Sequence, residues 1–339
     1  MPAMKILGNL QKIWTDFRNL MGGGKISKET VTPGTSSDRA ERFDLKALVI
    51  VFQPADPDEH GRKLPDILGW HDVDELITEY ILDLKKCSHG IANYQVVEKI
   101  EVDEFPPKQD GFRYEMKGYR HSLQSRSGFH QPDQLDYESL IDQFNIIERI
   151  NRNEMDEVWL FGFPYAGFYE SRMVGPGSFF CNAPPLDIYH HCLKRFMMMG
   201  FNYERGVGEM LESMGHRAEF TMSQIYRNEP SDSNLWRKFC RIERTHPGRS
   251  QVGTVHFAPN SRRDYDWGNP QPVFSFSDAW FNFPVLDGEK RKVDCREWGN
   301  GDIRLHHIWW FAHFPHFYGM TDGYSHNWWE YILVPERVR

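Results

Sequence analysis

The fold class follows from two stretches of the chain, Asp156-Glu-Val-Trp-Leu-Phe-Gly-Phe-Pro164 and Phe196-Met-Met-Met-Gly-Phe-Asn-Tyr-Glu-Arg-Gly206. Each runs from an apolar, strand-like segment into a glycine-containing turn that carries polar groups. In open α/β sheets, ligands bind where strands end and the backbone turns toward a helix. The repetition therefore predicts an α/β fold in which polar side chains gather at the ends of two strands.

Apolar and amphipathic segments alternate elsewhere in the chain. Ala47–Phe52 is a continuous apolar run, typical of a strand that is buried on both faces. Asp72–Lys86 carries apolar residues at helical spacing behind a capping aspartate. The pattern further predicts strands at Tyr94–Val102 and Glu157–Phe161 and a helix at Tyr137–Ile150. Such alternation predicts βαβ units and a mixed or parallel sheet flanked by helices.

The chain divides into an N-terminal region, residues 1–42, and a body, residues 43–339. Apolar residues recur at helical spacing between Ile6 and Met21, which predicts a short amphipathic helix. A polar, Ser/Thr-rich segment typical of a flexible linker follows it. The helix either docks on a partner or membrane surface, or packs on the parent domain or a neighbouring subunit. The body is a single α/β domain, and from about residue 252 its aromatic- and histidine-rich segments predict short strands and long loops.

The composition limits the classes of function. The 339 residues, 40% hydrophobic and 26% charged, suffice for a globular domain, and a net charge of −8 offers no basic surface for nucleic acid. Five cysteines without a C-x-x-C pair indicate buried free thiols rather than a disulfide framework. No apolar run is long enough for a transmembrane segment. No signal peptide is visible, so a cytoplasmic location is expected, although a secreted mature form also fits.

One predicted helix, Tyr203–Met222, concentrates polar side chains on one side. At about 100° per residue, that side collects five of them, those of Arg205, Glu209, Glu212, His216 and Glu219. Glu212 and His216, at i and i+4, can together with Glu219 bind a metal ion or form an acid/base set. The alternative is a solvated helix face with stabilising ion pairs.

The two ends of this helix are too far apart to share one small site. If Asn202 caps the helix, Glu204 and Arg205 lie in its first turn beside the end of a strand. His216 then lies about 18 Å further along, at about 1.5 Å per residue. Either the first turn joins the strand-end crevice, with Asn202 and Arg205 binding substrate, or the His216 stripe faces another layer, such as the C-terminal segment.

Glu170 follows the first of the two strand-like stretches, in a loop punctuated by glycines and prolines. Such a loop brings main chain close to a ligand and holds a carboxylate in place, which suits catalysis, and Tyr169 beside it is a candidate substrate contact. A buried, hydrogen-bonded turn carboxylate is the alternative. Cys181 follows the same loop, but no base for a thiol nucleophile is evident nearby.

His256 lies at the predicted end of a strand, ahead of Asn260, Tyr265 and Asp266. An imidazole there, oriented by an amide and a carboxylate, is a candidate general base or acid. The three following residues are candidate substrate contacts. A packed structural histidine is the alternative interpretation of His256.

Aromatic residues make up 14% of the chain, and many lie beside polar groups in the C-terminal half. The most prominent are Trp267, Trp280, Trp298, Trp309, Trp310, Tyr324, Trp328 and Trp329. Flat ring faces in such settings can stack on sugars, whereas the alternative is that they bury a loop-rich half of the protein. His313 and His316 have a spacing seen at metal sites, although Pro315 and the aromatic neighbours favour a packed layer.

These candidates support three hypotheses. The first is a hydrolase acting on a saccharide, with Glu170 and either Glu204 or Glu212 as carboxylates. His256 or His216 assists proton transfer in it. The second is a metal-assisted hydrolase that uses Glu212, His216 and a distant histidine, and the third is a non-catalytic glycan- or partner-binding protein. The expected cofactor is none or a divalent metal, and the expected partner is a small molecule or glycan. The common dinucleotide, nucleotide, serine-hydrolase and zincin motifs are absent, which disfavours those classes.

Overall fold

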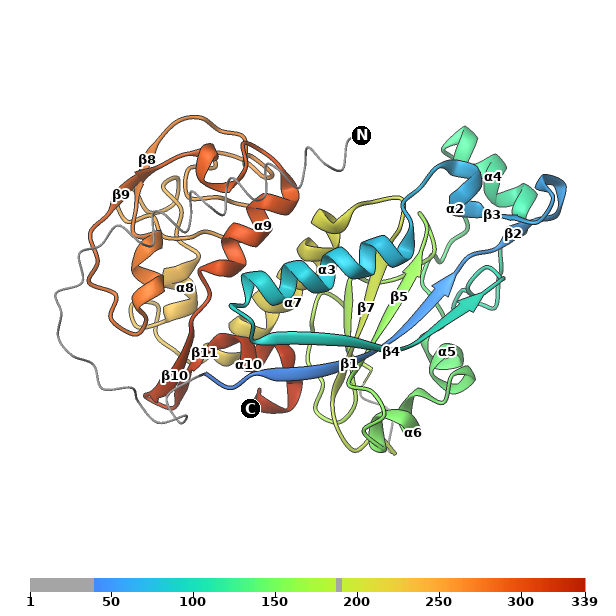
Figure 1. Ribbon diagram of the computed structural model, residues 1–339, viewed down its shortest axis with the longest axis horizontal. Helices are drawn as coiled ribbons and strands as arrows, with labels where there is room; N and C mark the ends of the chain where they lie inside the picture. The colour runs from blue at the N-terminus through green and yellow to red at the C-terminus, as the bar shows by residue number, and fades with distance from the viewer. Residues whose placement is uncertain (1–39, 187–190, 339) are drawn as a thin grey trace. The chain divides into compact units, whose positions relative to one another are not determined.

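The computed structural model describes residues 40–186 and 191–338, which belong to one compact unit. A five-stranded sheet with the strand order β4-β1-β5-β7-β6 forms its centre (Figure 1). In this order, β4, β1, β5 and β7 run parallel to one another, and β6 pairs with β7 in antiparallel fashion. These strands are β1 (Phe43–Phe52), β4 (Ala92–Val102), β5 (Glu157–Gly162), β6 (Ser171–Val174) and β7 (Phe196–Asn202). The predicted α/β fold with a mixed sheet among helices is confirmed.

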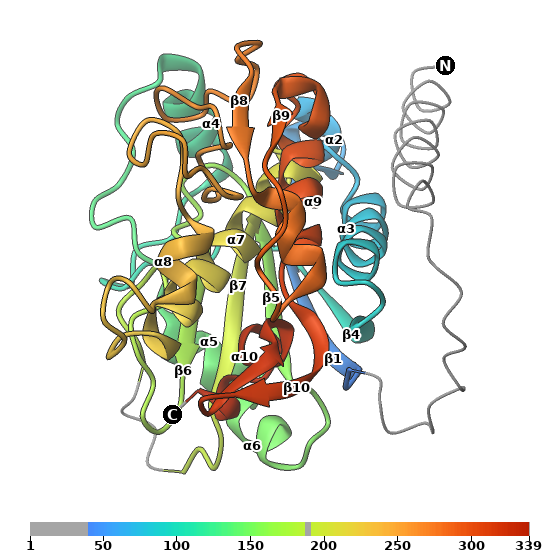
Figure 2. The same cartoon turned by 90° about the vertical axis from the view of Figure 1, so that its left-hand side faces the viewer.

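Helices and short irregular elements surround this sheet. The helices are α2 (Leu64–Leu68), α3 (Val73–Cys87), α4 (Met116–Ser125), α5 (Tyr137–Gln143), α6 (Ile146–Asn151), α7 (Val207–Ile225), α8 (Leu235–Phe239), α9 (Ile303–Ala312) and α10 (Trp328–Leu333). Three two-stranded sheets pair β2 (Ala55–Asp56) with β3 (Arg62–Lys63), β8 (Val273–Ser275) with β9 (Arg291–Val293), and β10 (His316–Thr321) with β11 (Tyr324–Asn327). Helix α7 contacts both α3 and α9 (Figure 2). None of the helices described is both long and apolar enough to cross a membrane.

Burial explains why the predicted strands form. The last six residues of β1 are 2% exposed or less, and every residue of β5 is buried. A continuous apolar run of this kind is expected in a central parallel strand, which is covered on both faces. Helix α3 begins where predicted, because the Asp72 side chain accepts a hydrogen bond from the backbone N–H of Glu75 at 2.9 Å. The amphipathic helix predicted between Ile6 and Met21 lies outside the described residues.

Two predictions about helices in this body are wrong. The helix expected over Tyr137–Ile150 is two helices, α5 and α6, because Asn145 between them adopts a left-handed conformation with φ of 51°. The segment 303–311, for which the sequence predicts strands and loops, is part of helix α9. The Asp302 side chain caps α9, and most of its residues are buried. A helix covered on nearly all sides has no polar face, so its period is hidden in the sequence.

The start of α7 also differs from the prediction. Asn202 does not cap the helix, because it is the last residue of β7, and its side-chain oxygen accepts the backbone N–H of Glu204 at 2.9 Å. The N-cap is Gly206, whose backbone N–H donates to the carboxylate of Glu209 at 3.2 Å. Glu204 and Arg205 therefore belong to the connection between β7 and α7 rather than to the first turn of the helix.

A large aromatic cluster fills the C-terminal part of the body. Trp280, Trp310 and Trp328 are 0% exposed, and their ring centroids lie 5.0, 6.2 and 5.5 Å from that of Phe239. All seven tryptophans considered as sugar-stacking surfaces are at most 7% exposed. They cannot stack on a ligand, and they form the core that holds this loop-rich part together.

Candidate metal centre

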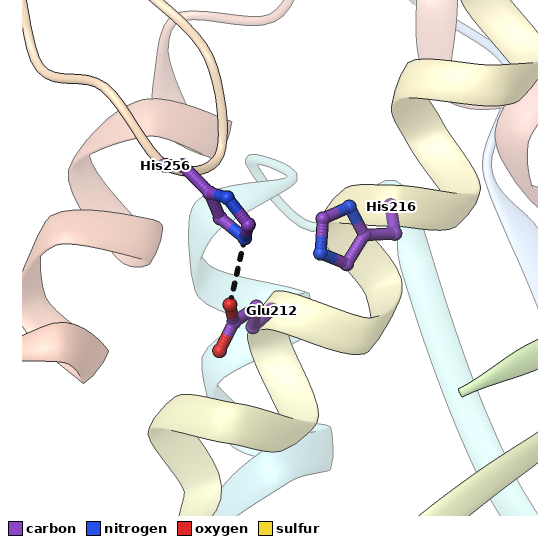
Figure 3. Close-up of side chains that lie close together, drawn as sticks. All are labelled: Glu212, His216 and His256. Atoms are coloured by element: carbon purple, nitrogen blue, oxygen red, sulfur yellow. Dashed lines mark hydrogen bonds and ion pairs between the residues drawn. The ribbon is translucent and has the colours of Figure 1, made fainter. Parts of the chain in front are cut away.

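Helix α7 and the loop that follows α8 bring Glu212, His216 and His256 together (Figure 3). One ligand atom from each of these side chains lies within 4.8 Å of the other two. Nε2 of His256 is 2.9 Å from Oε1 of Glu212. The Tyr265 hydroxyl donates to the same carboxylate oxygen at 2.9 Å and lies 3.1 Å from Nε2 of His256. One carboxylate and two imidazoles at this spacing can bind a divalent ion such as Zn²⁺.

Glu212, His216 and Glu219 of the predicted polar stripe face the C-terminal part of the protein. Arg205 precedes α7 and is exposed. Glu212 is only 7% exposed, and the loop carrying His256 lies against it. The approach is close because position 215 is glycine: a Cβ there would lie 2.5 Å from Cγ2 of Val255. His256 lies in this irregular loop and not at the end of a strand, so that part of the prediction is wrong.

A buried ion pair fixes α7 against the sheet. Nη1 of Arg217 is 2.8 Å from Oε2 of Glu157 on β5, and the two side chains are 1% and 2% exposed. Nε of Arg217 donates to the carbonyl of Ile332 at 2.9 Å, and Glu157 accepts a hydrogen bond from Nε1 of Trp159 at 2.6 Å. Because Arg217 follows His216 directly, these bonds also fix the rotation of α7 that turns His216 toward the cluster.

In both histidines of the cluster, Nδ1 lies beside a carboxylate. Nδ1 of His216 is 3.2 Å from Oε2 of Glu219, and Nδ1 of His256 is 3.1 Å from Oδ1 of Asp264. The second oxygen of Glu219 accepts the backbone N–H of Val255 at 3.0 Å, so Glu219 also ties the loop to the helix. Carboxylates in this position hold a metal-binding histidine in the tautomer that leaves Nε2 for the ion.

The cluster changes the acidity of its members. Burial favours the neutral form of Glu212, but hydrogen bonds from His256 and Tyr265 outweigh it and lower the pKa of Glu212. Burial also opposes the charged histidines, yet Glu219 raises the pKa of His216 and Glu212 raises the pKa of His256. Burial and Glu212 raise the pKa of Tyr265, so its hydroxyl stays a donor. A metal ion bound here would compete with protons for the two imidazoles.

A cavity of about 320 Å³ lies beside the cluster, at the ends of β5 and β7. The loop 163–170, the end of β7, the first turns of α7, Asp133 and Gln134 line it. Glu170 joins cavity and cluster, because its Oε2 is 3.8 Å from Nε2 of His216. The side-chain amide of Asn182 donates to the same oxygen. The volume is at the lower end of the range of about 300–1,000 Å³ that is usual for small-molecule sites.

Most of the predicted site residues line this cavity or a neighbouring hollow. Three of them line the cavity together with Glu170, namely Tyr169, Asn202 and Arg205. Three more line the neighbouring hollow, which shares Arg205 with the cavity: Glu204, Glu212 and Tyr265. The strand-end crevice and the His216 stripe, which the sequence presents as alternatives, are therefore adjacent parts of one region along α7.

Asn260 and Asp266, two predicted substrate contacts, have their hydrogen bonds within their own loop. Nδ2 of Asn260 donates to the carbonyls of Asn269 and Gln271, at 2.8 Å in both cases. Oδ2 of Asp266 accepts the backbone N–H of Arg262 at 2.9 Å. Both side chains hold the shape of the loop that presents Tyr265.

The other histidine pair and the cysteine considered as a nucleophile are packed groups. Nδ1 of His313 lies 2.7 Å from the carbonyl of Trp309, and His316 stacks on His89 with ring centroids 3.6 Å apart. Burial raises the pKa of Cys181 to about 11, which leaves little thiolate near neutrality. Within residues 40–186 and 191–338, Glu212, His216 and His256 form the one group with metal-site spacing.

Four residues of the region were not among the sequence candidates: Asp264 on His256, Asn182 on Glu170, and Asp133 and Gln134 of the cavity wall. Asp264 immediately precedes Tyr265, so a carboxylate next to a candidate residue was an available signal. Asn182 lies 12 residues beyond Glu170. No local pattern indicates that the chain folds back to join these two.

Comparisons with known proteins return no match: no family model fits the chain, and neither a curated protein nor a solved structure is significantly similar to it. The function is therefore inferred from the geometry of this region.

Proposed function

We propose that the protein is a metal-dependent hydrolase whose ion is held by Glu212, His216 and His256. The observation that carries the proposal is the carboxylate on Nδ1 of each histidine, at 3.2 Å for His216 and 3.1 Å for His256. Such contacts leave the Nε2 atoms of both histidines available to an ion beside Glu212, as the supporting residues of zinc sites do. Two histidines and a glutamate are a ligand set of catalytic zinc, which leaves a further position for water or substrate.

The surrounding side chains have the chemistry that hydrolysis of a carbonyl compound needs. An ion held by Glu212, His216 and His256 would lower the pKa of a water molecule and polarise a carbonyl oxygen. Glu170, on the cavity side, accepts a proton from the water as it adds to the carbonyl carbon and returns that proton to the leaving nitrogen or oxygen. Tyr265 donates to the carbonyl oxygen as negative charge develops on it. The C–N or C–O bond then breaks, giving a carboxylic acid and an amine or alcohol.

An amide or ester suits this region better than a phosphate ester. The carboxylates of Asp133, Glu170 and Glu209 all line the cavity, against a single guanidinium, that of Arg205. Asp133 is paired with Lys108, but the carboxylates of Glu170 and Glu209 would repel a phosphoryl group and offset the attraction of an ion for it, whereas a carbonyl group carries no charge.

Metal binding is the first test, on the full chain stripped of metal by a chelator. Titration calorimetry is expected to show one equivalent of Zn²⁺ binding, which Glu212→Gln and His256→Ala abolish. Glu138→Gln and His121→Ala change exposed side chains of α5 and α4 and leave binding unaltered. A wild-type protein that takes up no stoichiometric Zn²⁺ contradicts the proposal.

A metal-free hydrolase that acts on a saccharide is the second candidate. It is favoured by the presence of two carboxylates near His216, those of Glu170 and Glu212, because glycoside hydrolysis requires a carboxyl pair. Chelation separates the two candidates. Turnover of para-nitrophenyl acetate that stops with chelator and returns with Zn²⁺ supports the metal-dependent enzyme, whereas turnover of a para-nitrophenyl glycoside that survives chelation supports the second.

A further inference from the structure

The cavity beside the metal centre indicates which kind of molecule the enzyme accepts. Glu170 lines the cavity and its Oε2 lies 3.8 Å from Nε2 of His216. A substrate whose carbonyl group lies at the metal centre therefore extends its remaining part into the cavity. The volume of about 320 Å³ suits a ligand of small-molecule size.

The charges around the cavity disfavour an anionic ligand. Three carboxylates line it, and one of them, Asp133, already pairs at 2.6 Å with Nζ of Lys108, whose side chain is fully buried. An anionic ligand would therefore lie among carboxylates. The exposed guanidinium of Arg205 lines the same space and balances one of the two carboxylates that remain, those of Glu170 and Glu209. A neutral polar ligand avoids the repulsion that an anion meets.

Both hydrogen-bond donors and acceptors line the cavity. Asn202 and Arg205 supply N–H donors, and the carboxylates of Glu170 and Glu209 supply acceptors. Hydroxyl groups both donate and accept, so a ring that carries several of them can bond to both kinds of group. The cavity offers both kinds of polar contact, as recognition of a polyhydroxylated ring requires.

Tyr169 forms a fixed aromatic wall of the cavity. Its hydroxyl accepts a hydrogen bond from Nε2 of Gln134 at 2.6 Å, and its backbone N–H donates to the hydroxyl of Tyr137 at 2.8 Å. Its main chain passes directly over β7, where a Cβ on Gly200 would lie 2.3 Å from the carbonyl oxygen of Tyr169. Fixed aromatic side chains among polar groups provide apolar surface for the C–H groups of a ring.

We propose that this cavity binds a neutral, hydroxyl-rich ring, which makes the substrate an N- or O-acylated sugar or a similar acylated polyol. The assignment rests on the proposed hydrolase function, because Glu170 places the acyl group of such a ligand at the metal centre. Water adds to the acyl carbon, the bond from that carbon to the sugar nitrogen or oxygen breaks, and the leaving atom takes up the proton. The products are a carboxylic acid and the free amino group or hydroxyl of the ring.

Saturation-transfer NMR on the full, Zn²⁺-loaded chain tests the ligand class with two probes. N-acetylglucosamine is neutral, and its phosphate ester at the primary hydroxyl is anionic. We expect the neutral probe to bind and the anionic probe to bind at least about tenfold more weakly. Equal or tighter binding of the anionic probe overturns the inference.

Variants of the cavity wall locate the binding. Tyr169→Ala and Asn202→Ala are expected to weaken binding of N-acetylglucosamine about tenfold, the equivalent of one or two lost contacts. Tyr169→Phe keeps the ring and most of the affinity, and Glu138→Gln on α5 is the exposed control. Circular dichroism and Zn²⁺ titration of each variant confirm that the fold and the metal centre are intact. Unchanged binding in both cavity variants contradicts the assignment.

The Zn²⁺ measurement and the sugar measurement test the two proposals separately. If the wild-type protein binds Zn²⁺ but not N-acetylglucosamine, the substrate class is wrong and the hydrolase proposal stands. If it binds N-acetylglucosamine but not Zn²⁺, the metal-dependent mechanism is wrong, and the cavity remains a site for a neutral ring.

Discussion

Glu219 connects two parts of the metal centre that are far apart in the chain. One of its oxygens lies 3.2 Å from Nδ1 of His216, and the other accepts the backbone N–H of Val255 at 3.0 Å. Val255 precedes His256, so a single carboxylate orients one proposed ligand directly and the second through its backbone. Such supporting contacts are worth about 10- to 100-fold in metal affinity.

Glu219→Gln tests this double contact. The amide oxygen can still accept the N–H of Val255, but the charge that favours the Nδ1 proton of His216 is gone. We expect Zn²⁺ affinity to fall about 10- to 100-fold, as measured by competition with a chromogenic chelator. The same substitution at Glu138 is the control, and equal affinities in the two variants would show that Glu219 does not support the ion.

Tyr265→Phe tests the proposed donor to the developing oxyanion. The hydroxyl lies 2.9 Å from Oε1 of Glu212 and 3.1 Å from Nε2 of His256, among the proposed ligand atoms. Removing it is expected to lower kcat for para-nitrophenyl acetate by about 10²- to 10³-fold. Zn²⁺ affinity changes little, because three ligands remain. A variant with normal kcat excludes this role for Tyr265.

At the scale of elements, α7 acts as the scaffold of the region. Glycines at two positions let other segments approach it, since a Cβ on Gly208 would lie 2.4 Å from Cγ2 of Ile303 on α9, and one on Gly215 would lie 2.5 Å from Cγ2 of Val255. These approaches are tighter than any side chain allows without movement. Helix α7 and the loop that carries His256 can therefore lie this close only because position 215 has no side chain.

Gly215→Ala is expected to damage the metal centre from a position that carries no ligand. The added methyl pushes the loop outward, which destabilises the fold by about 1–3 kcal/mol and separates His256 from Glu212. Urea unfolding and Zn²⁺ titration measure the two effects. Gly118→Ala is the matched control on α4, where nothing lies within 4 Å, and it is expected to stabilise by about 0.4–1 kcal/mol. Similar behaviour of the two variants would contradict the close approach at Gly215.

At the scale of the whole molecule, buried histidines in the aromatic C-terminal part make the stability of the protein depend on pH. Burial lowers the pKa of His313 to about 4 and that of His316 to about 4. An unfolded histidine titrates near about 6.5. Between these values the unfolded chain binds more protons than the folded one, so the free energy of unfolding decreases as the pH falls. The stability that these neutral rings contribute is complete above about pH 6.5 and is lost progressively toward pH 4.

Urea unfolding between pH 7.5 and 4.5 checks this dependence. We expect a loss on the order of 1–3 kcal/mol from each such histidine as the pH falls. His313→Phe removes one of these groups, so its stability should decrease less steeply with falling pH than that of the wild type. His121→Ala alters an exposed histidine and keeps the wild-type slope. Parallel curves for all three proteins would show that His313 is not held neutral by the fold.

Local sequence patterns were sufficient for the elements that support the site. The apolar run in β1, the capped amphipathic helix α3 and the strand–turn passages at β5 and β7 are all present. Each depends on interactions between neighbours in the chain, such as the Asp72 cap, or on burial that leaves a regular apolar pattern. Helix α9 was not predicted, because a helix that is buried on nearly all sides leaves no regular apolar pattern in the sequence.

The sequence by itself thus determined the α/β class, the two strand ends and the polar stripe on α7. Only the tertiary structure decided that Glu212 meets His256, which is 44 residues away, and that Glu170 meets His216. These contacts depend on the closeness of packing at Gly215 and on a loop without regular structure. Packing of that kind joins distant segments through excluded volume and hydrogen bonds, and no local periodicity records it.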